Sequence, residues 1–327
     1  MVHSPLFHFF LMYYLFVFVL LLAAEWFYFR LAGRFNIIDR PNERSSHTRV
    51  TLRGGGIVFY FGALVYFAGS GFEYPWFMAG LTLIAGVSFV DDIRSVAPQI
   101  RLILHFTAMV LLFYQLGMGG LPWWYIPIAL VVCTGIINAY NFMDGINGIT
   151  GGYSLVVLGA LAYVNHYRVH FAETPLLGVM LLAVAVFCLF NFRKRAKCFA
   201  GDVGSVGIAF VILFLLGKLI LQTGDPGYII LLAVYGVDSI LTIIHRLILH
   251  ENIGLPHRKH LYQLMANELK IPHTTVSAFY MVLQAVIFAG YLVFYTYRWW
   301  YFAAVVLLLC TGYVLFMRKY FRFYRIK

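Results

Sequence analysis

Two adjacent carboxylates, Asp91 and Asp92, end an apolar run in the stretch VSFVDDIRS. If that run is a membrane helix, the acids lie at its C-terminus, where the helix dipole already carries about half a negative charge. Two acids are unfavourable there unless a cation or a metal-bound phosphate offsets them. Arg101, which begins the next apolar run, could offset the acids or bind an anion. The dipole argument also predicts that Asp92→Asn is tolerated in folding.

A second polar group lies in NAYNFMDGINGITGG, residues 138–152. Spacings of three place Asn138, Asn141 and Asp144 along one face of a helix end, with Asn147 just beyond, so we expect these four side chains to converge. Their oxygens suit Mg²⁺, which takes few protein ligands and completes its shell with phosphate and water. The alternative is that the amides hold neighbouring helices together, but this explains neither the acid nor the glycines.

An aspartate between glycines opens a further apolar run in FAGDVGSVGIAF. In isolation, Asp202 is well explained as the N-cap of that helix. The glycines would also let backbone approach closely, and the positive end of a helix favours a metal-bound diphosphate.

Two basic loops accompany these acids. Residues 37–56 combine a basic cluster with three glycines, and they could contact anionic lipid head groups or cover a phosphate-bearing substrate. The stretch LPHRKHLYQ carries His257, Arg258 and His260. An arginine between two histidines fits phosphate better than zinc, because guanidinium binds phosphate with two hydrogen bonds. A merely basic loop stays open as an alternative.

Membrane helices must hold these segments. The chain has 327 residues, of which 62% are hydrophobic and only 11% charged, whereas about a quarter of the residues in a soluble domain are charged. With roughly 20 apolar residues per crossing, no separate soluble domain fits beside the helices. We expect an all-α polytopic bundle in which residues 1–327 form a single domain. Its eleven transmembrane helices, or ten, follow the apolar runs at about 6–29, 55–70, 76–90, 101–118, 123–140, 149–165, 175–192, 203–222, 226–246, 274–295 and 299–317.

The basic residues predict the topology. If alternate loops face opposite sides, one face holds all of the 24 Lys and Arg residues except Arg168, Lys218 and Arg298. By the positive-inside rule that face is cytoplasmic, with the N-terminus outside and the C-terminus inside. The same placement explains the net charge of +11 without a nucleic-acid partner. The candidate segments share this face: residues 30–54, 91–101, 138–150, 193–204 and 247–272.

In order and spacing, VDDI, NAYNFMDGINGITGG, FAGDVGSVGIAF and LPHRKHLYQ resemble the motifs of the polyprenyl-phosphate N-acetylhexosamine-1-phosphate transferases. The resemblance covers about residues 37–265. It implies transfer of a sugar 1-phosphate from a UDP-N-acetylhexosamine to undecaprenyl phosphate, with release of UMP, at the start of cell-surface glycan synthesis. It also implies a multi-pass protein of the bacterial inner membrane whose site faces the cytoplasm. Mg²⁺ is the implied cofactor, Mn²⁺ could replace it, and a homodimer is compatible with the family.

The resemblance also assigns roles by position. Asp202 resembles the principal metal ligand, with Asn141 as its companion. Asp91 and Asp92 resemble paired acids that receive the lipid phosphate and could take its proton, and Asp144 belongs to the motif near the nucleotide. Substrate contacts are implied for Arg101, Asn138, Asn147, His257, Arg258 and His260.

Two departures from the family pattern bear on these roles. Position 147 is Asn where many bacterial members have a second Asp, and the basic loop reads PHRKH instead of three consecutive histidines. HRKHLYQ is more similar to the subgroup that starts O-antigen or capsule synthesis than to the phospho-MurNAc-pentapeptide transferase of peptidoglycan synthesis, which is one alternative. Another is a lipid or nucleotide-sugar transporter, although interrupted helices meeting at mid-membrane would then be expected.

Overall fold

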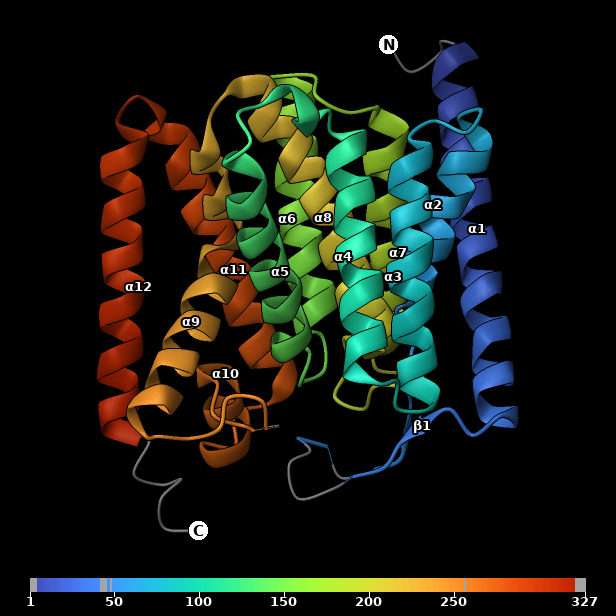
Figure 1. Ribbon diagram of the computed structural model, residues 1–327. Helices are drawn as coiled ribbons and strands as arrows, with labels where there is room; N and C mark the ends of the chain where they lie inside the picture. Colours follow the sequence, from blue (N-terminus) through green and yellow to red (C-terminus); the bar gives the residue numbers. More distant parts are fainter. Residues whose placement is uncertain (1–4, 42–45, 48, 256, 321–327) are drawn as a thin grey trace.

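The computed structural model describes residues 5–41, 46–47, 49–255 and 257–320. These residues form a bundle of long helices whose polar loops gather at one end (Figure 1). Each of the eleven predicted apolar runs forms a helix. The helices are α1 (Pro5–Arg34), α2 (Ile57–Gly69), α3 (Pro75–Ile93), α4 (Pro98–Gln115), α5 (Tyr125–Met143), α6 (Ile149–Tyr167), α7 (Thr174–Asn191), α8 (Gly201–Thr223), α9 (Ala233–Ile248), α11 (His273–Val293) and α12 (Arg298–Tyr320).

Short elements fill some of the connections. The strands β1 (Ile38–Asp39) and β2 (Thr51–Leu52) pair as a two-stranded antiparallel hairpin. Leu52 also forms an isolated β-bridge with Cys198. This hairpin is the sole departure from the all-α prediction among the described residues. The short helical segments are η1 (Met118–Gly120), η2 (Pro226–Leu232), α10 (Leu261–Gln263), η3 (Leu264–Glu268, a π-helix) and η4 (Tyr295–Tyr297).

Eight helices are long and apolar enough to cross a membrane: α1, α3, α5, α7, α8, η2 with α9, α11 and α12. The 13 residues of α2 form a shorter apolar helix. At 1.5 Å per residue α2 reaches roughly 20 Å, less than the hydrocarbon core of about 30 Å. It packs against α7, α8 and α3, so the bundle covers much of its surface. These features confirm a polytopic helical membrane protein.

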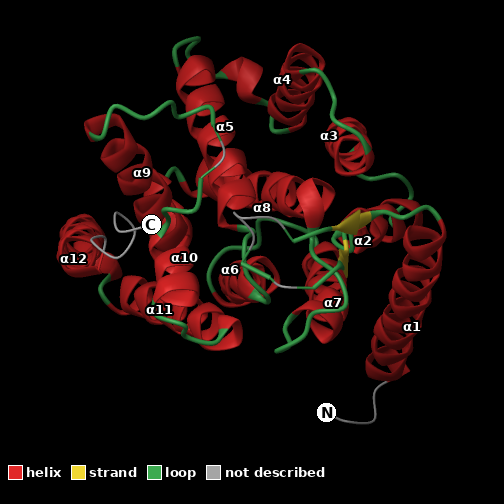
Figure 2. Ribbon diagram, turned by 90° about the horizontal axis from the view of Figure 1, so that it is seen from below, coloured by secondary structure: helices red, strands yellow, loops and turns green. Residues whose placement is uncertain are grey.

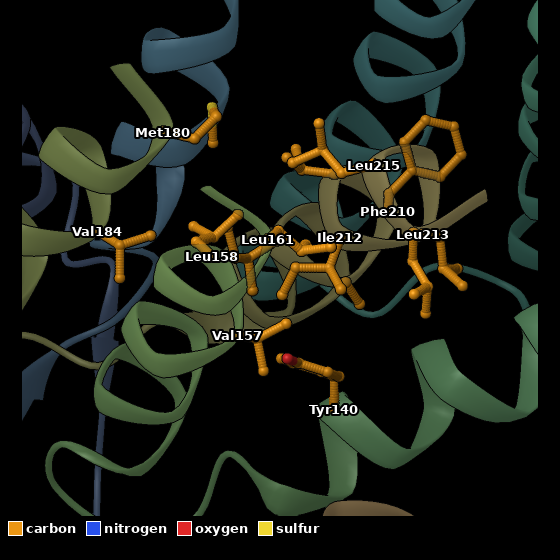
Figure 3. Packing of buried hydrophobic residues seen from close by; sticks show 14 of the residues in the cluster. Tyr140, Val157, Leu158, Leu161, Met180, Val184, Phe210, Ile212, Leu213 and Leu215 are labelled. Carbon is orange, nitrogen blue, oxygen red and sulfur yellow. The ribbon is translucent and has the colours of Figure 1, made fainter. Parts of the chain in front are cut away.

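The central helix of the bundle is α8. In its most apolar stretch 83% of the residues are buried, against 17% in α1, α5 and α12, whose exposed apolar side chains suit contact with lipid. Leu158 and Leu161 of α6 lie next to Ile212 of α8 (Figure 3). Because lipid is as apolar as this core, the hydrophobic effect does not hold α8 against its neighbours. Close packing of side chains does. The helix therefore gives a rigid base to whatever its first turn carries.

All five candidate segments lie at one end of the bundle, which we call the polar end (Figure 1, lower side). The C-terminal ends of α3 and α5 meet the N-terminal end of α8 there, as the view from below shows (Figure 2). The hairpin β1–β2 lies beside α2 and α8 at the same end. Residues far apart in the sequence are thereby brought to one place.

Candidate active site

Glycines allow the LRGGG loop to pack directly on the first turn of α8. The backbone N–H of Gly56 donates to the carbonyl of Ala200 at 3.1 Å, and a Cβ on Gly56 would overlap the Cα of Gly204. Gly201 has φ +71°, in the left-handed region that favours glycine, and a Cβ there would lie 2.5 Å from Oδ2 of Asp92. The glycines thus allow the close backbone approach that their positions predicted, and the two segments that approach each other are the LRGGG loop and the start of α8.

The two neighbouring acids have separate partners. Asp92, whose side chain is fully buried, accepts hydrogen bonds from the backbone N–H groups of Asp202 at 2.9 Å and Val203 at 3.0 Å. Its Oδ1 also lies 2.7 Å from Nε of Arg53. Asp92 therefore caps the N-terminus of α8, where backbone donors and the positive end of the dipole favour a carboxylate.

Asp91 is held by the loop that follows α3. Its Oδ1 accepts a hydrogen bond from the backbone N–H of Val96 at 2.7 Å, and its Oδ2 lies 2.7 Å from Nη1 of Arg101. The Arg101 side chain is 38% exposed. Arg101 does offset an acid of the pair, as its position in the sequence suggested, and the acid it meets is Asp91.

Asp202 is the meeting point of three segments. Its Oδ1 accepts a hydrogen bond from Nδ2 of Asn141 at 3.0 Å and lies 3.4 Å from Nη2 of Arg53. Its Oδ2 lies 3.9 Å from Nη2 of Arg101. With Asp91 and Asp92, three carboxylates face two guanidinium groups. One negative charge is left over, which favours the approach of a cation.

A cavity of about 210 Å³ opens beside this cluster, and we call it the site cavity. Its walls are mostly polar and come from four of the candidate segments, so ligand-binding donors and acceptors face one space. The residues around it are Asp39, Ser46, His47, Arg53, Asn141, Asp144, Gly145, Ile146, Phe199, Gly201, Asp202 and Gln263.

The asparagine-rich motif contributes only part of its polar residues to the cavity. Asp144 follows α5, lines the cavity and accepts a hydrogen bond from Oγ1 of Thr150 at 2.7 Å. Burial raises the pKa of Asp144 to about 7, against the lowering effect of the Thr150 bond. Asn138 lies exposed on α5, and the buried Asn147 donates to the carbonyl of Arg193 at 2.9 Å. The expected convergence of four side chains is therefore wrong for Asn138, which lies within α5 but is exposed, and for Asn147, because α5 ends after Met143 and the chain turns before Asn147.

Among the described residues of the basic loop, Gln263 lines the cavity, whereas His257, Arg258 and His260 do not. Arg258 lies 3.6 Å from Glu268, and the buried His260 has Nδ1 3.4 Å from Asp238. Nδ1 of His257 accepts from the backbone N–H of Lys259 at 3.3 Å. Burial, followed by the neighbouring His260 and cationic side chains, lowers the pKa of His257 to about 3, so His257 is neutral at pH 7. Phosphate contacts by Arg258 and the histidines stay a prediction.

The donors at the cavity fit a magnesium ion better than a transition metal. Among the described residues, no group of three or more His, Cys, Asp or Glu side chains is placed to hold a metal. Mg²⁺ needs only one or two carboxylates, because phosphate and water complete its octahedron. Asp202 and Asn141, which adjoin each other in the cavity wall, would supply side-chain oxygens of that kind.

Known proteins resemble this chain over the segment that holds part of the site. Residues 74–219 match the model of glycosyl transferase family 4. Along these residues the chain is similar to that family. Proteins that resemble more of the chain include the probable undecaprenyl-phosphate N-acetylglucosaminyl 1-phosphate transferase of Bacillus subtilis (strain 168), 25% identical over 72% of each chain. The undecaprenyl-phosphate alpha-N-acetylglucosaminyl 1-phosphate transferases of Yersinia pestis and Salmonella typhi are 25% and 26% identical, over 78% and 80% of this chain and 76% and 77% of theirs.

The matched family segment contains Asp91, Asp92, Asn141 and Asp202, but the cavity extends beyond it. Arg53, which contacts two of these acids, lies before the segment. Arg53 was not predicted as a site residue, because residues 37–56 as a whole were expected to contact lipid head groups or to cover a phosphate-bearing substrate. The signal was the LRGGG stretch itself, where a single arginine stands next to glycines that permit close packing.

Proposed function

We propose that this protein, which is similar to glycosyl transferase family 4 over residues 74–219, transfers an N-acetylhexosamine 1-phosphate from a UDP-sugar to undecaprenyl phosphate. The observation that carries the proposal is the site cavity, in which Asp202 lies between Asn141, Arg53 and Arg101 at the end of a membrane bundle. The names of the relatives support undecaprenyl phosphate as the acceptor. By analogy, the product would start a cell-surface glycan.

The proposed reaction is a phosphoryl substitution. An oxygen of undecaprenyl phosphate forms a bond to the sugar-bearing phosphorus of the donor. The bond from that phosphorus to the bridging oxygen breaks, its electron pair stays on this oxygen, and UMP leaves. Because the second pKa of a phosphate is near 6, the acceptor is mostly a dianion at neutral pH. Positioning and charge neutralisation should therefore matter more than removal of a proton.

The chain's own residues suit these two tasks. Arg53 and Arg101, each held by a carboxylate, would donate hydrogen bonds to the phosphates of the two substrates, and the remaining negative charge would be offset by a cation. Asp92 orients Arg53 and fixes the first turn of α8, so that Asp202 is held on rigid backbone. Asp202 and Asn141 would hold Mg²⁺, which when bound neutralises negative charge on the transferred phosphoryl group.

We further propose that the polar end faces the cytoplasm of a bacterial inner membrane. The asymmetry of Lys and Arg between the loops supports this orientation. The nucleotide donor would then meet the site from the aqueous side. The lipid phosphate would arrive at the depth where α3 ends.

The direct test is to incubate purified protein with undecaprenyl phosphate, Mg²⁺ and one of several UDP-sugars, and to identify the lipid product by mass. A diphosphate-linked sugar and equimolar UMP are expected, and Asp202→Asn serves as the inactive control. Product from UDP-MurNAc-pentapeptide alone would favour the peptidoglycan enzyme. Movement of an intact donor or lipid across liposomes, with no UMP released, would favour a transporter and contradict the proposal.

A further inference from the structure

Asp238 is a buried acid in α9 that the proposed chemistry does not use. It is 3% exposed, and α9 is the next long helix in the sequence after α8, which carries Asp202. Its Oδ1 accepts a hydrogen bond from the backbone N–H of Leu261 at 3.0 Å, and its Oδ2 accepts from that of Tyr262 at 3.4 Å. The acid of one helix thus caps the start of α10, more than 20 residues further along the chain.

Three side chains complete the surroundings of Asp238. Tyr280 of α11 donates its hydroxyl hydrogen at 2.7 Å, and Thr242, one turn along α9, donates at 3.2 Å. Nδ1 of His260 lies 3.4 Å from Oδ1. A hydrogen on Nδ1 leaves Nε2 of His260 as an acceptor, and this buried atom has no hydrogen-bond partner among the described residues. Asp238 therefore contacts the ring of His260 as well as the backbone of the two residues that follow it.

The segment held by Asp238 forms a wall of the site cavity. Gln263 lines the cavity and accepts a hydrogen bond from the backbone N–H of His260 at 3.3 Å. The hydroxyl of Tyr262 donates to the carbonyl of Phe142 at 2.9 Å, at the end of α5. Asn267 donates to Oγ of Ser46 at 3.0 Å, in the loop across the cavity. Displacing this segment would change the cavity on two sides.

Burial of an acid at this point needs a reason. An ionised carboxylate inside a bundle is costly unless hydrogen bonds or charges compensate it. Here the compensation comes from two backbone N–H groups, two hydroxyls and a histidine, drawn from α9, α10 and α11. The acid thereby ties three elements together. An apolar residue at position 238 would leave the backbone N–H groups of Leu261 and Tyr262 without this acceptor.

We propose that Asp238 is a positioning residue, which holds residues 257–263 in the place where they complete the wall of the substrate cavity. The inference rests on the proposed function for its effect on catalysis. The placement of the loop can be tested without any activity. Loss of the carboxylate should release the loop, so that substrate binding weakens while the carboxylate cluster around Asp202 is unchanged.

The loop position is tested by cross-linking. The rings of Phe142 and His257 lie 6.4 Å apart, so cysteines at these two positions should be joined by a short thiol-reactive cross-linker. Asp238→Ala is expected to reduce the yield about fivefold or more, because the loop then opens locally. Asp238→Asn keeps one acceptor oxygen and should give an intermediate yield if Asp238→Ala fails to fold.

Asp225→Ala is the matched control. Asp225 is also 3% exposed and accepts a tyrosine hydroxyl, from Tyr291 at 3.1 Å, but it pairs with Arg298 after the far end of α8. It should cost similar thermal stability and leave the cross-link yield unchanged. Equal yields in Asp238→Ala, Asp238→Asn and Asp225→Ala would overturn the proposal.

The catalytic consequence is measured on the same variants. Asp238→Asn should lower kcat/KM for the nucleotide-sugar by about a hundredfold, mainly through KM, since small displacements in a site have effects of that size. Its dependence on Mg²⁺ should match that of the wild type. A lower cross-link yield with unchanged kcat/KM would also overturn the proposal. If the wild type makes no lipid product at all, the proposed function fails, and the cross-link yield still decides whether Asp238 holds the loop.

Discussion

The carboxylate of Asp92 accepts a hydrogen bond at 2.9 Å from the backbone N–H of Asp202, 110 residues further along the chain. This bond joins the C-terminal end of α3 to the first turn of α8. The field of the α3 dipole disfavours Asp92, but the backbone donors of α8 and Arg53 outweigh it. The metal-ligand candidate and one of the paired acids therefore belong to the same hydrogen-bonded unit.

This unit reverses the expectation that Asp92→Asn is tolerated in folding. Replacing one partner of a buried pair leaves Arg53 uncompensated and weakens the cap of α8, so we expect a loss of about 3–5 kcal/mol in the free energy of unfolding. Asp91→Asn is the control and should cost less than about 1 kcal/mol, because Arg101 is partly exposed. Thermal unfolding in detergent measures both. Equal stability of the two variants would contradict the capping role.

Substitution of Asp91 distinguishes two roles for this residue: a general base, or a group that positions the lipid phosphate. Its two oxygens are bound by Val96 and Arg101, so we expect it to orient Arg101 towards the phosphates and not to remove a proton. Asp91→Asn should then regain part of its activity as the pH rises. The measurement is a pH–rate profile at saturating Mg²⁺ and UDP-sugar. A pH-independent loss of more than about a thousandfold would indicate an obligatory base.

Asp202→Asn should remove most of the activity and weaken the dependence on Mg²⁺ without unfolding the protein. The loss of one charge at a metal should cost several kcal/mol in the transition state. Asp39→Asn, which changes another acid in the wall of the same cavity, should leave the Mg²⁺ dependence unchanged. Titration of activity with Mg²⁺ compares them. Near wild-type turnover of Asp202→Asn at ordinary Mg²⁺ would exclude this ligand.

His257 should make the protein less stable in mild acid. Its folded-state pKa, lowered to about 3 by burial and then by neighbouring His260 and cations, lies below the ordinary value near 6.5. As the pH falls from about 7.5 to 5, the unfolded chain gains a proton that the folded protein does not, so the free energy of unfolding decreases. His257→Gln should flatten this decrease. Unfolding temperatures across this range test it, and parallel curves for both proteins would refute it.

The orientation of the bundle can be tested by labelling. Ser95 follows α3 and Tyr167 ends α6, and both are exposed. The C-terminal ends of these two helices lie at opposite ends of the bundle (Figure 1), and the positive-inside rule places Ser95 in the cytoplasm. In intact cells an impermeant maleimide should label Tyr167→Cys and spare Ser95→Cys until the cells are opened. The wild type, with its four native cysteines, gives the background. Labelling of Ser95→Cys in intact cells would show that the bundle has the opposite orientation.

The sequence by itself determined the helices and the segments that carry polar chemistry. Apolar runs of membrane length leave the backbone little choice other than the helix, because unpaired N–H and C=O groups are costly in lipid. All eleven runs form helices, and the motifs around Asp91, Asn141 and Asp202 meet at one end. These are properties of local composition and spacing.

Only the tertiary structure decided which side chains meet. The separate partners of Asp91 and Asp92, the entry of Arg53 into the cluster and the departure of Asn138 from it depend on how α3, α5 and α8 are packed. Helical periodicity ends with Met143, so it could not place Asn147, which lies past the turn. A hydrogen bond reaches about 3 Å, and a small rotation or shift of one helix against another exchanges its partners. Sequence spacing within each helix does not contain that information.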